Sequence, residues 1–201
     1  YAAAKFEFYG VVGYMHLTYN GTTTLGTIHI MAGLPRNGTE GYFYHLHQKP
    51  VPANGNCTET TGHLDPFHVN PMPGHPYPCN PDDLHTCEVG DLSGKHGLLY
   101  PADPSSRDWL TDTKPITFLD PQLDWTNDPA VSIFYGRSIN IHRPSDLVRY
   151  TCANLVETDK DWTPLSNAAL QASAMKTSID SYGNGSSIRF TGRPITALLI
   201  A

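Results

Sequence analysis

Two histidines separated by a single residue, His45 and His47, stand out among the ten histidines of this chain. In a β-strand, residues i and i+2 point to the same face and lie about 7 Å apart along the strand. Two imidazoles on one face of a rigid strand could therefore bind one metal ion. The alternative is a pair of surface histidines on a half-exposed strand, and the spacing alone does not decide between the two.

Two further histidines could complete a metal site of this kind. His63 lies at the start of an irregular region, and His142 ends a segment in which Ser138, Asn140 and His142 share one face of a predicted strand. Four imidazoles would suit either copper or zinc. A ligand set made only of nitrogen, with no cysteine nearby, favours copper modestly.

The cysteines and the glycosylation sequons together predict a secreted protein. The four cysteines are an even number, which allows three disulfide pairings. The chain also carries four Asn-X-Ser/Thr sequons, which are candidate glycosylation sites. The alternative is an intracellular protein with free thiols and unmodified Asn turns. The cysteines are Cys57, Cys79, Cys87 and Cys152, and the sequons begin at Asn20, Asn37, Asn56 and Asn184.

Length, composition and charge limit the classes of protein to which this chain can belong. With 201 residues, the chain fits one domain of β-sandwich size with additional chain, or two small domains. Hydrophobic residues make up 39% and aromatic residues 10%, which is enough for one core. The formal net charge of −6 argues against a nucleic-acid partner, because phosphate binding needs a basic face. The sequence opens at Tyr1 without Met or an apolar signal region, which predicts a processed form.

Short alternating segments separated by turn residues predict an all-β sandwich or barrel. Asn20-Gly21 is a strong hairpin dipeptide. The segment 49–97 is rich in Pro, Gly, Asn and Asp and shows no period, and an irregular stretch of this length in a compact domain is usually functional. The predicted strand segments are 6–8, 14–19, 25–31, 41–48, 115–119, 131–142 and 148–155.

The composition changes after residue 155. Ser166 or Asn167 could cap a short helix that runs to Lys176, and Ser181–Ser187 resembles a linker. The apolar content beyond residue 155 is too small for a second core. We therefore expect a domain over 1–155 and a C-terminal appendage over 156–201.

Six motifs appear in one order along the chain, and together they resemble the copper/zinc superoxide dismutases. The resemblance covers roughly residues 5–155 and implies a Greek-key β-sandwich, or flattened barrel, with a long metal-site loop. The fold it implies agrees with the strand pattern. The motifs are His45-Leu46-His47 followed by Cys57, Gly62–Pro66, Val89–Leu92, Gly136–His142, Asp146-Leu147 and Arg149–Cys152.

The resemblance also implies a role for individual residues. Arg149 matches the active-site arginine, which would guide the small superoxide anion to the metal. His63 would be the labile ligand, whose freed nitrogen accepts a proton when the copper is reduced. Cys57 and Cys152 match the disulfide of the family, and we expect Cys79 to pair with Cys87. The residues that match the ligands of one copper per chain are His45, His47, His63 and His142.

The chain departs from the zinc-containing members in two places. Asp91 is present, but Glu88 stands where the family has a zinc-binding histidine, and only six residues separate His142 from Arg149, where the family has a long charged loop. Both features resemble the copper-only superoxide dismutases of fungi, which are secreted or held at the cell wall by a lipid anchor. Zinc is therefore not expected. We expect Glu88 to orient His63 in its place, and Asp91 to continue that network.

Three alternatives remain open on the sequence alone. They are a secreted copper-binding domain without turnover, a zinc-containing dismutase with a rearranged loop, and a non-enzymatic glycosylated surface protein. Arg149 argues against the first, because copper storage needs no anion guide. The second would use His68, His75 or His85. We expect a monomer, with superoxide as a small-molecule substrate, and we expect His16 and His29 to be exposed and His96 to lie in a loop.

Overall fold

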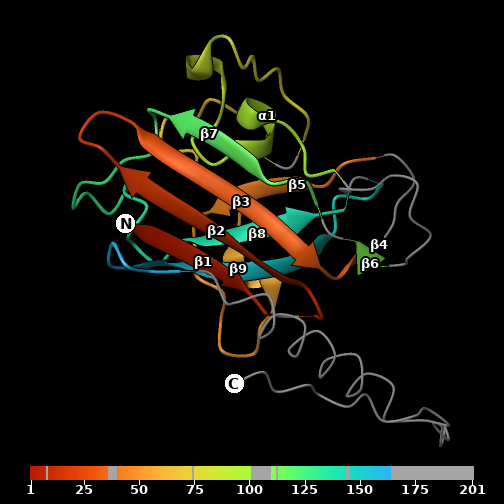
Figure 1. Cartoon of the computed structure of the whole chain (residues 1–201). Coiled ribbons are helices and arrows are strands. Elements are labelled where there is room, and N and C mark those ends of the chain that lie inside the picture. Colours follow the sequence, from red (N-terminus) through yellow and green to blue (C-terminus); the bar gives the residue numbers. More distant parts are fainter. Residues whose placement is uncertain are drawn as a thin grey trace, which may run out of the picture.

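The computed structural model describes residues 1–7, 9–35, 40–73, 75–100, 110–111, 113–143 and 145–163. Within these ranges the protein is an antiparallel seven-stranded sheet in the order β5-β8-β9-β1-β2-β3-β7, with a separate β4–β6 pair (Figure 1). The strands are β1 (Ala2–Phe6), β2 (Val12–Tyr19), β3 (Thr24–Ala32), β4 (Leu34–Pro35), β5 (Phe43–His47), β6 (Leu110–Thr111), β7 (Ile116–Asp120), β8 (Ser138–His142) and β9 (Arg149–Glu157). Three short helices accompany them, the 3-10 helices η1 (Cys57–Thr60) and η2 (Leu84–Thr86) and the α-helix α1 (Leu92–His96).

The sheet encloses one hydrophobic core. Met15 of β2 and Ile28 of β3 are fully buried and belong to the same cluster as Leu46 of β5 and Ile139 of β8. Strands that lie far apart in the order of the sheet thus share one core, so the sheet curls into a flattened barrel. This confirms the predicted all-β class.

The hairpin between β2 and β3 forms at the predicted dipeptide. The side-chain Oδ1 of Asn20 accepts hydrogen bonds from the backbone N–H groups of Thr22 and Thr23, each at 3.0 Å. These bonds close the turn and set the register of the two strands, which pair from Tyr19–Thr24 onward. The hairpin prediction is confirmed.

The long segment between β5 and β7 is attached to the edge of β5 by backbone hydrogen bonds. Leu46 N–H donates to Gly90 O, Gly90 N–H donates to Leu64 O, and Leu64 N–H donates to Leu46 O, at 2.7–2.8 Å. A Cβ atom at Gly90 would lie 2.3 Å from the Leu46 carbonyl oxygen, so only glycine fits this meeting point. The segment therefore holds three short helices and a fixed path, although its sequence shows no period.

Two disulfides constrain this segment, one that links it to β9 and one that lies within it. Cys57 at the start of η1 is bonded to Cys152 in β9, and Cys79 is bonded to Cys87. Both pairings are those predicted. The first attaches the loop beside the candidate ligands to the sheet, and the second closes a short loop immediately before Glu88.

Some predicted boundaries were wrong. The segment 131–142 was expected to be β-rich throughout, but β8 begins at Ser138, because the preceding turn is folded around Arg137. The guanidinium of Arg137 donates to the carbonyls of Ser132, Gln48 and Pro129 at 2.7–3.0 Å. His96 was expected in a loop, but it ends α1, where its Nε2 lies 2.9 Å from the Asp120 carboxylate.

The chain folds back onto the outer face of the sheet after β9. Thr158 N–H donates to Tyr1 O at 3.0 Å, and the ring of Trp162 stacks on His16 with centroids 5.0 Å apart. His16, which was expected to be exposed, is therefore half-buried, and burial lowers its pKa. His29 is also half-buried, against Tyr14.

Several predictions fall outside the described residues. They are the helix expected after Ser166 or Asn167, the linker Ser181–Ser187, and the sequons at Asn37 and Asn184. In the part of the chain that the structure describes, none of the helices has the length and apolar character needed to span a bilayer.

Candidate metal centre

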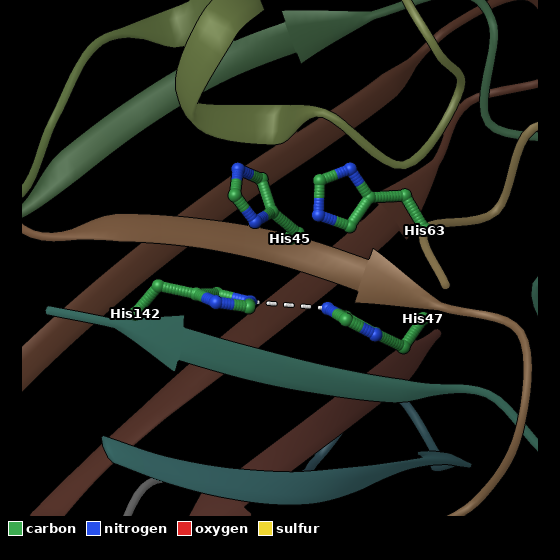
Figure 2. Close-up of side chains that lie close together, drawn as sticks. All are labelled: His45, His47, His63 and His142. Atoms are coloured by element: carbon green, nitrogen blue, oxygen red, sulfur yellow. Dashed lines mark hydrogen bonds between the residues drawn. The ribbon is translucent and has the colours of Figure 1, made fainter. Parts of the chain in front are cut away.

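Four histidines from three parts of the chain meet at one point beside β5 and β8 (Figure 2). His45 and His47 lie two apart on β5, and His142 ends the neighbouring strand β8. His63 enters from the long segment, where it forms a backbone bridge with His47. One ring nitrogen from each of the four lies within 4.8 Å of the others. The structure thus brings together all four histidines that the sequence singled out.

The hydrogen bonds of His47 and His142 show which nitrogen of each ring carries the proton. The Nδ1 of His47 lies 3.0 Å from Thr61 O, and the Nδ1 of His142 lies 3.0 Å from Leu147 O. Carbonyl oxygens can only accept, so both Nδ1 atoms carry hydrogen. Burial, followed by neighbouring positive charges, lowers the pKa of both rings, that of His142 to about 3. Both rings are therefore neutral near pH 7, with a bare lone pair on Nε2.

These two lone pairs face one another. The Nε2 atoms of His47 and His142 lie 3.1 Å apart, as the dashed line in Figure 2 marks. Neither neutral ring has a proton to place between them. Two facing lone pairs repel at this distance unless a cation binds both, so this contact fits a metal ion.

His45 contributes a third lone pair through its other nitrogen. Its Nε2 lies 3.0 Å from Ser93 Oγ and 3.3 Å from the Asp91 carboxylate, so Nε2 carries the hydrogen. Its Nδ1 is buried and has no hydrogen-bond partner among the described residues. Burial, followed by the charge of His63, lowers the pKa of His45 to about 4. An unpartnered buried acceptor is costly, and a bound metal ion would remove that cost.

His63 differs from the other three because it reaches the solvent. About a quarter of its side chain, 26%, is exposed. Its Nδ1 contacts the carboxylate of Glu88, which leaves Nε2 for the cluster. The four residues therefore fit a copper ion with nitrogen ligands, three of them buried and one accessible.

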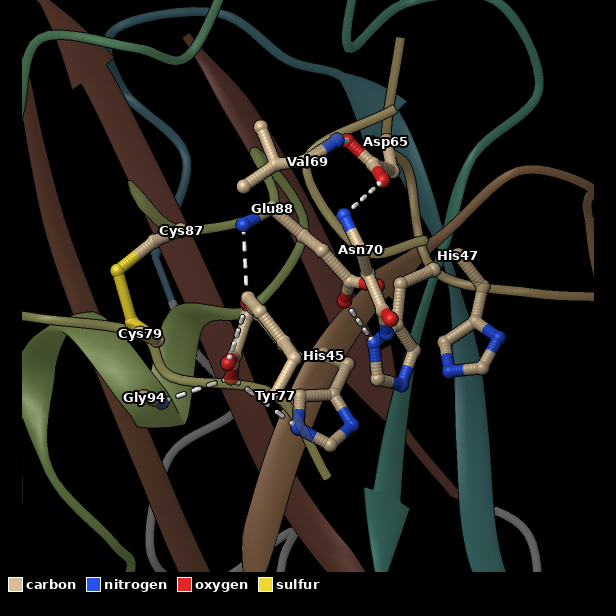
Figure 3. A network of polar contacts seen from close by, with 12 residues as sticks. His45, His47, Asp65, Val69, Asn70, Tyr77, Cys79, Cys87, Glu88 and Gly94 are labelled. Atoms are coloured by element: carbon tan, nitrogen blue, oxygen red, sulfur yellow. Dashed lines mark hydrogen bonds and ion pairs between the residues drawn. A yellow bond between two sulfur atoms is a disulfide. The ribbon is translucent and has the colours of Figure 1, made fainter. Parts of the chain in front are cut away.

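The Glu88 carboxylate, one of the groups drawn in Figure 3, has a partner on each oxygen. Only 2% of the residue is exposed. Its Oε2 contacts His63 Nδ1, and its Oε1 accepts a hydrogen bond from the side-chain amide of Asn70 at 2.9 Å. Asn70 is in turn fixed by its backbone N–H, which donates to the Asp65 carboxylate at 3.0 Å.

Asp91 supports His45 as Glu88 supports His63. Its carboxylate contacts His45 Nε2, caps α1 through Gly94 N–H at 2.8 Å, and accepts from the Tyr77 hydroxyl at 2.9 Å. Burial would raise the pKa of Asp91, but the hydrogen bond and charge of His45 and the other two donors outweigh it and hold the pKa well below its usual range. Asp91 is therefore ionised.

Arg149 lies at the start of β9 and is held by backbone carbonyls of η1 and of Thr61, the residue that follows η1. Its Nη1 donates to Cys57 O at 2.8 Å and to Thr58 O at 2.7 Å, and its Nη2 donates to Thr61 O. Its charge adds to the effect of burial in lowering the pKa values of His47 and His142. The permanent positive charge of Arg149 thus acts on the rings of His47 and His142.

The sequence did not single out three residues that support the site, namely Asn70, Tyr77 and Ser93. Each of them contacts a residue that is far away in the sequence, namely Glu88, Asp91 and His45 respectively. No period or motif in the sequence indicates these contacts. Conversely, the histidines proposed for an alternative zinc site are exposed. Among the described residues, none of them belongs to a group of three or more metal-binding side chains. These histidines are His68, His75 and His85.

No family model matches the chain. Among curated proteins, it is 34% identical over 137 residues to "Cell surface superoxide dismutase [Cu-Zn] 6" of Candida albicans, covering 66% of this chain and 37% of that protein. It is 38% identical over 121 residues to "Cell surface Cu-only superoxide dismutase" of Arthroderma benhamiae, covering 60% of this chain and 29% of that protein. It is 31% identical over 141 residues to "Cell surface Cu-only superoxide dismutase 5" of Candida albicans, covering 70% and 52%. The chain thus spans about a third to a half of the length of these relatives.

A solved structure agrees with these relatives. The Cu(II) form of superoxide dismutase 5 of Candida albicans superposes with a TM-score of 0.61 at 29% sequence identity, over 83% of this chain and 95% of that one. The sequence relatives, this structural likeness and the four converging histidines make the chain similar in sequence and in fold to the fungal cell-surface superoxide dismutases.

Proposed function

We propose that this protein is a copper-dependent superoxide dismutase that acts outside the cell. The observation that carries the proposal is the cluster of His45, His47, His63 and His142, in which nitrogen lone pairs converge without protons to pair them. Such a set would hold one copper ion per chain. The relatives are named as cell-surface dismutases, and the two disulfides also suit an oxidising compartment.

Copper held there would supply one-electron chemistry, alternating between Cu(II) and Cu(I) as one superoxide gives up an electron and a second accepts one. The chain's own part is to hold and move a proton. His63 suits this role because its ring is the most exposed of the four and its Nδ1 is held by Glu88. Its Nε2 could take up a proton and give it to the reduced oxygen species.

Arg149 would bind and guide the anionic substrate. The whole chain is negative, with a formal charge of −6, so attraction of superoxide must be local. The guanidinium is held rigidly by the carbonyls of η1, which leaves its charge fixed near the cluster. A permanent cation beside the metal raises the rate at which a small anion arrives.

We further propose that the site works without zinc. Glu88 and Asp91 hold His63 and His45 directly, and their carboxylate oxygens are engaged by donors from the protein. Two carboxylates thus give the orientation that a second metal ion could otherwise provide. The alternative functions are a copper-binding domain without turnover and a dismutase that also binds zinc.

One experiment tests this proposal against both alternatives. The protein is loaded with copper alone or with copper and zinc, its metal content is measured by mass spectrometry, and superoxide decay is followed directly. We expect one copper and no stoichiometric zinc per chain, with rapid decay. His142→Ala should lose copper and activity, whereas the matched control His75→Ala, an exposed loop histidine, should keep both. Bound copper without turnover would favour the binding domain, and one zinc per chain would favour the zinc enzyme.

A further inference from the structure

One hydroxyl group joins the two carboxylate residues that support the histidine cluster (Figure 3). The Tyr77 Oη donates to Asp91 Oδ2 at 2.9 Å and accepts from the backbone N–H of Glu88, also at 2.9 Å. Burial and the nearby Asp91 carboxylate raise the pKa of Tyr77, so the hydroxyl keeps its proton and remains a donor. Both of its hydrogen bonds therefore have a defined direction.

The residues that Tyr77 joins contact different rings of the cluster. Glu88 contacts Nδ1 of His63, and Asp91 contacts Nε2 of His45. The rings of His45 and His63 lie with their centroids 4.0 Å apart. The relative position of these two rings thus depends on the relative position of the two carboxylates, which share the Tyr77 hydroxyl.

The Cys79–Cys87 disulfide holds Tyr77 in this position. Tyr77 lies two residues before Cys79, and Cys79 N–H donates to Tyr77 O at 3.0 Å. Glu88 directly follows Cys87. The disulfide therefore links the backbone of Tyr77 to the backbone of Glu88, while the tyrosine hydroxyl links their other sides.

We propose that Tyr77 is a positioning residue for the metal site, which sets the spacing of His45 and His63 through Asp91 and Glu88 and is itself held by the Cys79–Cys87 disulfide. This inference rests on the proposed binding of copper by the four histidines. Replacing the hydroxyl by hydrogen leaves the Glu88 N–H and one Asp91 oxygen without their partner. Glu88 and Asp91 would then each lose one of the contacts that hold them beside the rings that they support.

The test compares Tyr77→Phe with Tyr135→Phe. Tyr135 is a matched control, because its hydroxyl also donates one hydrogen bond, to Asn127 O at 2.8 Å, but on the exposed surface. The apparent copper affinity is measured by competition with a chelator, and the Cu(II) electron paramagnetic resonance spectrum reports the ligand geometry. Changing a residue behind a metal ligand typically weakens metal binding 10–100-fold. We expect about a 10-fold loss for Tyr77→Phe with a changed spectrum, and neither effect for Tyr135→Phe.

A second pair of variants tests the part played by the disulfide. Replacing Cys79 and Cys87 together by serine should weaken copper binding in the same direction as Tyr77→Phe. Adding Tyr77→Phe to that variant should then give little further loss, because both changes release the same contact. If the two losses multiply independently, the disulfide does not act through Tyr77.

These measurements remain informative whatever the outcome for turnover. Copper affinity and the Cu(II) spectrum need no dismutase activity, so a wild-type protein that binds copper without turnover would end the proposed function and still test Tyr77. In the copper-free protein, hydrogen exchange at the Glu88 amide should become faster in Tyr77→Phe and stay unchanged in Tyr135→Phe. Unchanged affinity, spectrum and amide exchange in Tyr77→Phe would overturn the inference.

Discussion

The ammonium group of Lys95 lies 2.6 Å from the carboxylate of Asp120, and both side chains are completely buried. Lys95 belongs to α1 and Asp120 ends β7, so this ion pair attaches the helix to the edge of the sheet. The same ammonium donates to Val89 O at 2.9 Å. Because Val89 lies between Glu88 and Gly90, the ion pair also fixes the segment that carries the carboxylate bound to His63.

Lys95→Met should strongly destabilise the protein. It leaves the Asp120 charge buried without its ammonium partner, and breaking a buried pair in this way costs about 3–5 kcal/mol. Urea unfolding measures the loss, with the exposed Lys114→Met as the control, which should change little. The double variant Lys95→Met with Asp120→Leu should recover part of the stability, because no buried charge is left. A small effect of Lys95→Met alone would show that the pair contributes little.

The stability of the protein should fall in acid partly because of Asp120. Burial alone would raise its pKa, but the hydrogen bond from His96 and the charge of Lys95 outweigh burial and hold the pKa below its ordinary value. The folded state therefore binds this proton less readily than the unfolded chain. The stabilising contribution is complete above the unfolded pKa of about 3.9 and is lost as the pH falls toward the folded value.

Comparison with Asp120→Asn isolates this contribution. The variant should be less stable than the wild type at pH 7, and the difference between them should shrink as the pH falls below about 4. Urea unfolding at a series of pH values gives both curves. A difference that stays constant down to pH 3 would assign the acid sensitivity to other groups.

The sequence predicted the parts of the site that repeat locally or match the family, and missed those made by distant contacts. In a β-strand, side chains alternate between the two faces with a period of two residues. His45 and His47 therefore lie on one face, independently of the rest of the fold. The path of the segment 49–97 could not be predicted, because the hydrogen bonds that attach it to the edge of β5 join residues far apart in the sequence and leave no period. The roles of Asn70 and Tyr77 could not be predicted for the same reason, because each side chain forms its hydrogen bond with a residue in another part of the segment.

Trp162 should stabilise the sheet without affecting copper binding. Its ring packs on His16 and Tyr14 on the outer face of β2, with centroid distances of 5.0 and 5.9 Å. Such aromatic pairs contribute about 0.5–1.5 kcal/mol each, so losing both in Trp162→Ala should lower the free energy of unfolding by about 1–3 kcal/mol. A chain that ends after Thr163 should keep this packing and bind copper normally. Loss of copper binding in either variant would show that this region supports the metal site.

Arg149→Ala should slow the reaction with superoxide while copper stays bound. Removing a charge that steers an anion lowers the rate of encounter by about 10-fold or more at low ionic strength, and the difference should shrink as salt is added. Arg149→Lys keeps the charge but cannot span the carbonyls of Cys57, Thr58 and Thr61, so it should recover only part of the rate. Superoxide decay at several salt concentrations measures this. Equal salt dependence in all three proteins would exclude steering by Arg149.

The Glu88 carboxylate should determine how well His63 works. Its contact with His63 Nδ1 is the one predicted from its position three residues before Asp91, and Asn70 holds the other oxygen. Glu88→Gln keeps the size and one acceptor oxygen but loses the charge, while Glu88→Ala loses both. We therefore expect Glu88→Ala to impair turnover or copper retention more than Glu88→Gln, with the curled sheet still folded in both variants.

The Glu88 variants can lose turnover, copper or both, and these effects must be measured separately. Superoxide decay between pH 6 and 9, with copper content measured in each sample, separates slower turnover from lost metal. Glu59→Gln is a suitable control, because Glu59 is an exposed carboxylate of η1 that contacts only Asn54 and Asn56 among the described side chains. If Glu88→Ala matched this control in rate and copper content at every pH, His63 would not depend on Glu88, and Asp91 would be the next carboxylate to test.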